Sequence, residues 1–203
     1  MKIGGVVLAG GLSRRMEGRE KSLMPINGKS SLERVVARFA PQVEKLAINA
    51  NGDASRFSSL GLPVIPDCVT GNVGPLAGIL TGMRWAKDEG FSHVATAATD
   101  TPFFPLDYVG RLNAFLSSKD IAMAYSNGRI HPVFAIWPVS LANDLYSFLV
   151  DEDQRKILVF TNPYTVAEID FTPSDEAKDD DPFFNINTPE DLRIAESRAG
   201  AIA

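Results

Sequence analysis

The chain begins with a short apolar run that stops at two consecutive glycines. The run extends from Ile3 to Ala9 and contains two adjacent valines. A short apolar run bounded by glycines is typical of a strand that is buried on both faces. The run therefore predicts a buried first strand, which requires a fold built on an internal sheet.

A glycine-rich, basic loop follows this strand. Gly10 and Gly11 lack a Cβ, so their backbone amides can adopt positive φ and come close to a phosphate. Arg14, Arg15 and Lys21 supply three cations, the arginines through forked hydrogen bonds and the lysine as a point charge. The stretch predicts a loop that binds a nucleotide triphosphate at the carboxyl end of the first strand.

Two common phosphate-binding motifs are missing from this loop. The P-loop pattern G-x-x-x-x-G-K-[ST] does not occur there, and neither does the dinucleotide fingerprint G-x-G-x-x-G. The chain reads instead L-A-G-G-x-S-x-R-M-x-G-x-x-K. The alternative is an ordinary glycine-rich turn with scattered charges, but three cations around two glycines favour a phosphate site.

Strand and helix patterns alternate through the first half of the chain. Strands are expected at 45–49, 63–65 and 93–98. Ser30 with Glu33 resembles a capping box that opens a helix ended by Pro41. Further helices are expected near 54–60, from Pro75 to about 87, and from Pro105 to about 116. This alternation predicts a parallel sheet covered on both faces.

The second half is less regular. Strands at 121–125 and 131–137 flank Asn127-Gly128, which predicts a hairpin. After them we expect a helix at 138–150, a strand at 166–171, and a terminal helix capped by Thr188. The segment 153–160 fits either a helix or a strand, and a short helix is favoured. Five carboxylates between 175 and 181 predict a solvated surface loop.

Composition excludes several classes of protein. At 203 residues, one domain is expected, and a net charge of −5 argues against a nucleic-acid-binding surface. The lone Cys68 excludes an intramolecular disulfide and a cysteine metal cluster, and we expect it to be partly buried. No stretch approaches the ~20 apolar residues of a membrane span. No secretion signal precedes the first strand, so a cytoplasmic protein is expected.

Polar residues follow the carboxyl ends of several predicted strands. In an open parallel sheet, ligands bind beyond these ends, which gathers the 10–21 loop, Asn49, Asp67 and Asp100 at one rim. A hard carboxylate such as Asp100, next to a triphosphate, suits Mg²⁺. Each of Asn49, Asp67 and Asp100 can instead be a turn former, since Asn and Asp are frequent in turns.

The ordered motifs resemble the molybdenum cofactor guanylyltransferases, which belong to the sugar-phosphate and cofactor nucleotidyltransferases. The motifs are L-A-G-G-x-S-x-R-M, the lysine, N-A-N, G-P-L-A-G, D-T-P, H-P and N-x-N-T-P. The resemblance implies a single three-layer, Rossmann-like α/β domain with a mostly parallel sheet, of the nucleotide-diphospho-sugar transferase type. That domain would span 1–203, with a nucleotide-binding half at about 1–105 and an acceptor-binding half at about 106–203.

The resemblance also implies a site and a reaction. GMP would pass from GTP to molybdenum-bearing molybdopterin, with Mg²⁺ bound and pyrophosphate released. Lys21, Asp100 and Arg15 would be catalytic, and Asp100 and Asn187 would bind the metal. The nucleotide would be bound by Leu8, Ala9, Gly10, Gly11, Ser13, Arg14, Lys21, Asn49, Asp67 and Asp100. We expect a monomer that has transient contact with molybdenum-insertion and acceptor enzymes and binds neither nucleic acid nor membrane.

Several assignments keep an alternative. Asn187 can instead belong to the capping segment before a helix. His131 can be a structural residue rather than a contact to the pterin. Arg155-Lys156 can meet the acceptor's phosphate or be solvated. The family commonly reads R-M-G-x-D-K where this chain has Glu17 and Glu20, so the geometry of the loop is open.

Two rival functions remain at this stage. One is a cytidylyltransferase acting on the same cofactor or on a sugar or polyol phosphate. Cytidylyl relatives tend to read L-A-A-G where this chain has L-A-G-G over residues 8–11, and the missing methyl group leaves room for a purine. The other rival is a non-catalytic nucleotide-binding protein of the same fold, against which the presence of both Lys21 and Asp100 weighs.

Overall fold

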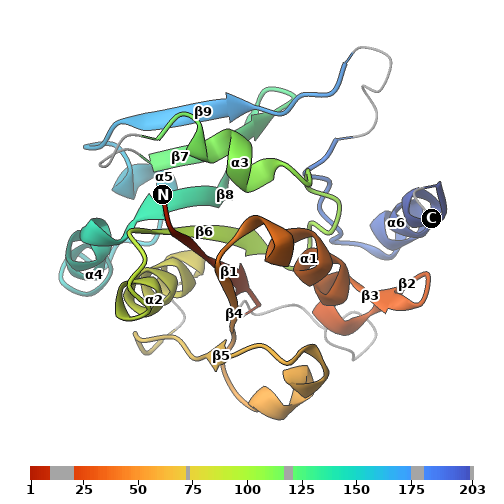
Figure 1. The fold of residues 1–203 in the computed structure, drawn as a ribbon, viewed down its shortest axis with the longest axis horizontal. Coiled ribbons are helices and arrows are strands. Elements are labelled where there is room, and N and C mark those ends of the chain that lie inside the picture. Colours follow the sequence, from red (N-terminus) through yellow and green to blue (C-terminus); the bar gives the residue numbers. More distant parts are fainter. Residues whose placement is uncertain (10–20, 72–73, 117–120, 175–180, 202–203) are drawn as a thin grey trace.

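A computed structural model describes residues 1–9, 21–71, 74–116, 121–174 and 181–201. Its centre is a seven-stranded sheet in the order β5-β4-β1-β6-β8-β7-β9 (Figure 1). The strands are β1 (Ile3–Leu8), β4 (Lys45–Asn49), β5 (Val64–Ile65), β6 (His93–Ala98), β7 (Ile121–Ser126), β8 (Arg129–Pro138) and β9 (Val166–Asp170). A separate two-stranded hairpin pairs β2 (Pro25–Ile26) with β3 (Lys29–Ser30).

The sheet is mostly parallel, as predicted. Strands β5, β4, β1 and β6 run parallel to one another. Strand β8 is antiparallel to both of its neighbours, and the edge strand β9 is parallel to β7. The predicted hairpin between β7 and β8 is confirmed, with positive φ at Asn127 (47°) and Gly128 (78°), as a tight two-residue turn requires.

Helices cover both faces of the sheet, which gives the predicted three layers (Figure 1). On one face, α1 (Ser31–Phe39) and α3 (Tyr108–Asn113) bury Phe39 and Tyr108 against the sheet. On the other face lie α2 (Pro75–Asp88), α4 (Ala142–Val150) and α5 (Ile157–Phe160). Helix α6 (Pro189–Ala201) packs outside these layers, beside β2, in a smaller cluster with Ile26 and Phe103.

Local signals in the sequence account for the helix ends. Ser30 and Glu33 form the predicted capping box, since Glu33 N–H donates to Ser30 Oγ (3.2 Å) and Ser30 N–H donates to Glu33 Oε2 (2.6 Å). The chain leaves α1 through a 3-10 turn at Ala40–Gln42 that contains Pro41. Thr188 caps α6 as predicted, because its Oγ1 accepts a hydrogen bond from Asp191 N–H (3.1 Å).

Some local predictions need correction. The helix expected from Pro105 is shorter and begins at Tyr108, because residues 105–107 form a turn closed by a bond from Tyr108 N–H to Pro105 O (3.2 Å). The helix near 54–60 is a 3-10 helix, and only Ile157–Phe160 is helical within 153–160. Cys68 is exposed rather than partly buried.

The helices described here include none that is both long and apolar enough to cross a membrane.

Candidate functional site

The register of the parallel strands places four carboxyl-terminal residues in one row. Leu8 pairs with Asn49 on one side and Ala98 on the other, and Asn49 pairs with Ile65. The row continues into the loops, since Ala9 N–H donates to Asn49 O (2.8 Å) and Ala50 N–H donates to Ile65 O (3.1 Å). Any residue that follows one of these strands therefore lies at the same rim.

Asp67 follows β5 and is held by two asparagine side chains. Asn49 Nδ2 donates to Asp67 Oδ1 (2.9 Å), and Asn51 Nδ2 donates to Asp67 Oδ2 (2.7 Å). Asn51 Oδ1 also accepts from Asp67 N–H (2.9 Å). Asn49 is only 2% exposed, and its Nδ2 also donates to Ile65 O (3.2 Å), so the cluster is anchored in the sheet. The predicted residues Asn49 and Asp67 are thus in direct contact.

Helix α2 approaches this cluster closely at Gly78. A Cβ built on Gly78 would lie 2.4 Å from Asn49 Oδ1 and 2.9 Å from Leu8 Cδ2, distances at which a neighbour must shift. A glycine is therefore needed here for the helix to lie against the rim. The second glycine of the G-P-L-A-G motif thus has a packing reason.

Asp100 lies two residues beyond the end of β6, just as Asp67 lies two residues beyond β5. Its carboxylate is partly exposed, and its Oδ1 accepts a hydrogen bond from Thr101 Oγ1 (3.3 Å). Its carbonyl oxygen accepts from Ile186 N–H (2.8 Å). This bond places the backbone of Asn187, the next residue, beside the Asp100 loop.

The residues around Asp100 are compatible with a divalent cation. Within the described ranges, no cluster of three or more His, Cys, Asp or Glu side chains could hold a metal by itself. A small hard cation does not need such a cluster, because it is commonly bound by one or two carboxylates together with water and substrate phosphates. A lone, partly exposed carboxylate at the rim fits that mode of binding.

The phosphate-loop predictions fall largely outside the described residues. Seven residues of the predicted loop lie outside the described ranges: Gly10, Gly11, Ser13, Arg14, Arg15, Glu17 and Glu20. Lys21 begins a 3-10 helix over Lys21–Leu23 that leads into β2. The described chain stops at Ala9, next to the rim, and resumes at Lys21.

A second polar cluster lies between β7, β8 and the segment before α6. Ser126, which is fully buried, has its Oγ 2.8 Å from His131 Nε2 and 2.9 Å from Asp181 Oδ1. Asp181 Oδ1 also accepts from Phe183 N–H (2.9 Å), and the His131 ring stacks on Phe183 with centroids 4.5 Å apart. The prediction of a solvated loop is wrong for Asp181; residues 175–180 lie outside the described ranges.

The charges around His131 act in opposite directions. Burial lowers the pKa of His131 below its ordinary value, the nearby Asp181 raises it, and Arg129 lowers it. Because burial is the largest effect, the neutral imidazole is favoured in the folded protein.

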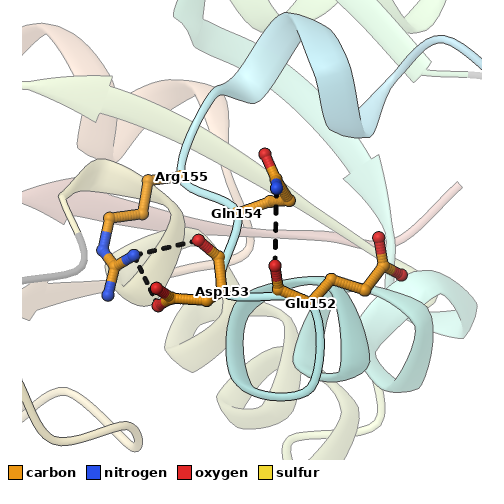
Figure 2. Close-up of polar contacts among 4 residues, drawn as sticks. All are labelled: Glu152, Asp153, Gln154 and Arg155. Atoms are coloured by element: carbon orange, nitrogen blue, oxygen red, sulfur yellow. Dashed lines mark hydrogen bonds and ion pairs between the residues drawn. The ribbon is translucent and has the colours of Figure 1, made fainter.

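Arg155 folds back onto its own loop (Figure 2). Its Nη1 lies 2.6 Å from Asp153 Oδ1 and donates to Asp153 O (3.0 Å). Gln154 Nε2 donates to Glu152 O (3.4 Å) in the same loop, and Asp153 has a positive φ of 51°. The two side chains are 44% and 78% exposed, so this ion pair contributes about 1 kcal/mol at most.

Four residues of these clusters were not among the predicted site residues: Asn51, Gly78, Ser126 and Asp181. Asn51 and Gly78 lie in the N-A-N and G-P-L-A-G motifs, so their motifs were the available signal. Ser126 carries no sequence signal, and Asp181 is one of a run of acidic residues.

Comparisons with known proteins agree with this architecture. A family model described as a MobA-like NTP transferase domain matches residues 5–164. A molybdenum cofactor guanylyltransferase from Mesorhizobium japonicum is 51% identical over 198 residues, covering 95% of this chain and 94% of the relative. A protein of the same name from Rhizobium meliloti is 47% identical over 196 residues, covering 95% and 89%.

Among solved structures, the molybdopterin-guanine dinucleotide biosynthesis protein A from Archaeoglobus fulgidus has a TM-score of 0.73 with this chain. The two are 26% identical, and the match covers 98% of this chain and 99% of that one. With a family match over most of its length and relatives about half identical to it, the chain belongs to the family of MobA-like NTP transferase domains.

Proposed function

We propose that this protein transfers GMP from GTP to the phosphate of molybdenum-bearing molybdopterin and releases pyrophosphate. One observation carries the proposal: Asp67 and Asp100 follow strands β5 and β6, which stand at the two ends of the row β5-β4-β1-β6. Three strand spacings separate these strands, about 14 Å. Two carboxylates this far apart suit a long ligand with a base at one end and phosphates at the other.

The base would bind at the end of the row that contains Asn49 and Asp67. Guanine presents N–H donors and a carbonyl acceptor along one edge, as an amide does. The Asp67 carboxylate, fixed by Asn49 and Asn51, can accept from such donors. The backbone of Leu8 to Gly11 is the natural partner for the remaining groups. The names of the close relatives support guanine over cytosine.

The triphosphate would lie toward Asp100, with Lys21 and the arginines Arg14 and Arg15 offsetting its charge. The attacking phosphate of the acceptor is already anionic at neutral pH, so no strong general base is needed. Its oxygen forms a bond to the α-phosphorus of GTP while the bond from that phosphorus to the pyrophosphate oxygen breaks. The protein then contributes mainly positioning and neutralisation of charge.

Members of this family generally use a divalent metal, and we propose that this one is Mg²⁺. Asp100 would hold it, with Asn187 as a second contact. When bound, the ion neutralises phosphate oxygens and draws electron density from them. The backbone bond from Ile186 N–H to Asp100 O supports this pairing, because it keeps Asn187 at the same loop.

The acceptor would occupy the half of the chain at about 106–203, with the nucleotide in the half at about 1–105. Arg155 would exchange Asp153 for the acceptor's phosphate, with Lys156 beside it. Breaking the Arg155–Asp153 ion pair costs little free energy, because the pair is exposed to solvent. We further propose that the protein acts as a monomer and meets the molybdenum-insertion and recipient enzymes transiently.

Pyrophosphate release tests this function. Molybdopterin loaded with molybdate would be incubated with Mg²⁺ and with GTP, CTP, ATP or UTP separately. Release with GTP alone supports the proposal. Release with CTP keeps the mechanism but overturns the assignment of the base. If no nucleotide gives pyrophosphate release and GTP still binds measurably, the protein is a binding protein or uses another acceptor.

The variants Lys21→Ala and Asp100→Ala test the assigned roles. Each should lower the turnover number by at least two orders of magnitude, since each removes a charge next to the reacting phosphates. Circular dichroism should show that the fold is retained. Full activity in either variant would remove that residue from the mechanism.

A further inference from the structure

Ser126 joins two segments that lie far apart in the sequence. Its Oγ is 2.8 Å from His131 Nε2, across the β7–β8 hairpin, and 2.9 Å from Asp181 Oδ1 in the segment before α6. The serine is fully buried, and among the described residues its hydroxyl bonds to these two groups. Its bonding must therefore be satisfied by His131 and Asp181.

The positions of the protons shared by Asp181, Ser126 and His131 follow by elimination. An aspartate carboxylate only accepts hydrogen bonds, so Ser126 must donate its single proton to Asp181. The hydroxyl then has no proton left for His131 and can only accept from it. His131 must therefore carry its proton on Nε2, which leaves a lone pair on Nδ1 in the neutral ring.

The same segment contacts both His131 and the Asp100 loop. Phe183 stacks on the His131 ring with centroids 4.5 Å apart, and Ile186 N–H donates to Asp100 O (2.8 Å). Phe183 and Ile186 are three residues apart, so their Cα atoms are separated by at most about 11 Å. This segment therefore links the His131 ring to the Asp100 loop through a few consecutive residues.

We propose that Ser126 and Asp181 are positioning residues that hold His131 as its Nε2–H tautomer, so that Nδ1 accepts a hydrogen bond from an N–H or O–H group of the acceptor substrate. This inference rests on the proposed function for the identity of the acceptor. The placement of the proton itself does not depend on it. A pterin carries several N–H donors, which an unprotonated ring nitrogen recognises and an N–H would repel.

The charges that face His131 agree with a neutral ring. Its environment contains Asp181, which favours the imidazolium, and Arg129, which opposes it. Burial outweighs Asp181, so the pKa of His131 is lowered and the ring is neutral at pH 7 and above. Only in that form does Nδ1 have a lone pair to offer.

Nitrogen NMR on protein labelled with ¹⁵N-histidine tests the tautomer without any substrate. The chain contains only two histidines, so the variant His93→Gln identifies the signals of His131. We expect a single Nε2–H tautomer at pH 8 in the wild type. In Asp181→Asn the side-chain amide can donate to Ser126. The serine can then donate its proton to His131 instead, so both tautomers should be seen. An Nδ1–H tautomer in the wild type, or no change in Asp181→Asn, overturns the proposal.

Kinetics then test the contact with the acceptor. Ser126→Ala should raise KM for the acceptor about tenfold, the loss of one oriented hydrogen bond, while KM for GTP changes less than twofold. Ser126→Thr, which keeps the hydroxyl, should restore the wild-type value. Unchanged KM for the acceptor in Ser126→Ala removes the proposed contact.

The variant Ser92→Ala is the matched control. Ser92 Oγ lies 3.0 Å from His93 Nδ1, at the opposite, amino-terminal end of the sheet, and this variant should leave both KM values unchanged. If wild-type protein releases no pyrophosphate with GTP and acceptor, the proposed guanylyl transfer is wrong. The NMR measurement still decides the tautomer, because it uses no substrate.

Discussion

At the scale of single residues, Asp67 is held by hydrogen bonds with two neighbouring asparagines. Both carboxylate oxygens and the backbone N–H of Asp67 bond to asparagine side chains. Asn51 makes two of these three bonds and lies at the exposed side of the cluster. We infer that Asn51 contributes to nucleotide binding by holding Asp67 in one orientation.

The variant Asn51→Ala should therefore raise KM for GTP about tenfold, because two hydrogen bonds to Asp67 are lost, at about 1 kcal/mol each, and the carboxylate can rotate. The turnover number should change less, since the phosphates bind elsewhere. Steady-state pyrophosphate release at varied GTP measures both. Ser55→Ala is the control, because Ser55 bonds to Asp53 in the next turn, and it should behave as wild type. An unaltered KM in Asn51→Ala would show that Asp67 needs no such support.

At the scale of elements, α2 lies against the rim because Gly78 has no side chain. Gly78 lets the helix lie directly on Asn49 and Leu8, where any Cβ would collide. The buried residues of the same helix pack against the sheet on both sides of this contact, so α2 cannot simply move away. The strain of a larger residue must then be relieved at Asn49.

Gly78→Ala should consequently weaken GTP binding at least tenfold, since Asn49 would have to rotate away from Asp67 and Ile65. Overpacking of this kind costs about 1–3 kcal/mol of stability. Calorimetric titration with GTP and urea unfolding measure the two effects.

Gly110→Ala in α3 is the matched substitution. A Cβ there meets nothing within 4 Å, so the added methyl should stabilise the helix by about 0.5–1 kcal/mol and leave GTP binding intact. Equal effects of the two substitutions would contradict the assigned role of Gly78.

At the scale of the whole molecule, the buried His93 and the partly buried His131 connect stability to pH. Burial lowers the pKa of both His93 and His131 below the ordinary value of 6.5. His93 is 3% exposed, and its Nε2 has no hydrogen-bond partner among the described residues. Below pH 6.5 the unfolded chain binds protons that the folded protein does not, so stability is present above that pH and declines as the pH falls below it.

The free energy of unfolding should therefore decrease between pH 7.5 and 5.5. The variant His93→Gln should show a shallower decrease, because one of the two titrating groups is gone. Urea unfolding at several pH values measures this slope. Carboxylates with lowered pKa values, Glu33, Asp53 and Asp170, act only at more acidic pH and do not obscure it. Identical slopes in the variant and the wild type would exclude His93 as a source of the effect.

Much of the fold could be predicted from the sequence because its signals are local. The capping box at Ser30, the turn at Asn127-Gly128 and the buried run of β1 each depend on residues a few positions apart. The strand that ends at Asn49 and the strands that precede Asp67 and Asp100 are predicted from the same kind of local signal. The rule that ligands bind beyond the carboxyl ends of parallel strands then brought these three residues to one rim.

Only the tertiary structure decided which of those residues touch and what surrounds them. The bond between Ser126 and Asp181 joins residues 55 positions apart, and the fit of Gly78 against Asn49 joins a helix to a strand end. An acidic run is solvated on average, and nothing within the run distinguishes Asp181 from its neighbours. The sequence by itself determined most strands and helices of the main sheet and its cover, because short-range hydrogen bonding and apolar periodicity encode them. The partners of each polar side chain were decided by packing between distant segments, where a few ångströms separate a hydrogen bond from none.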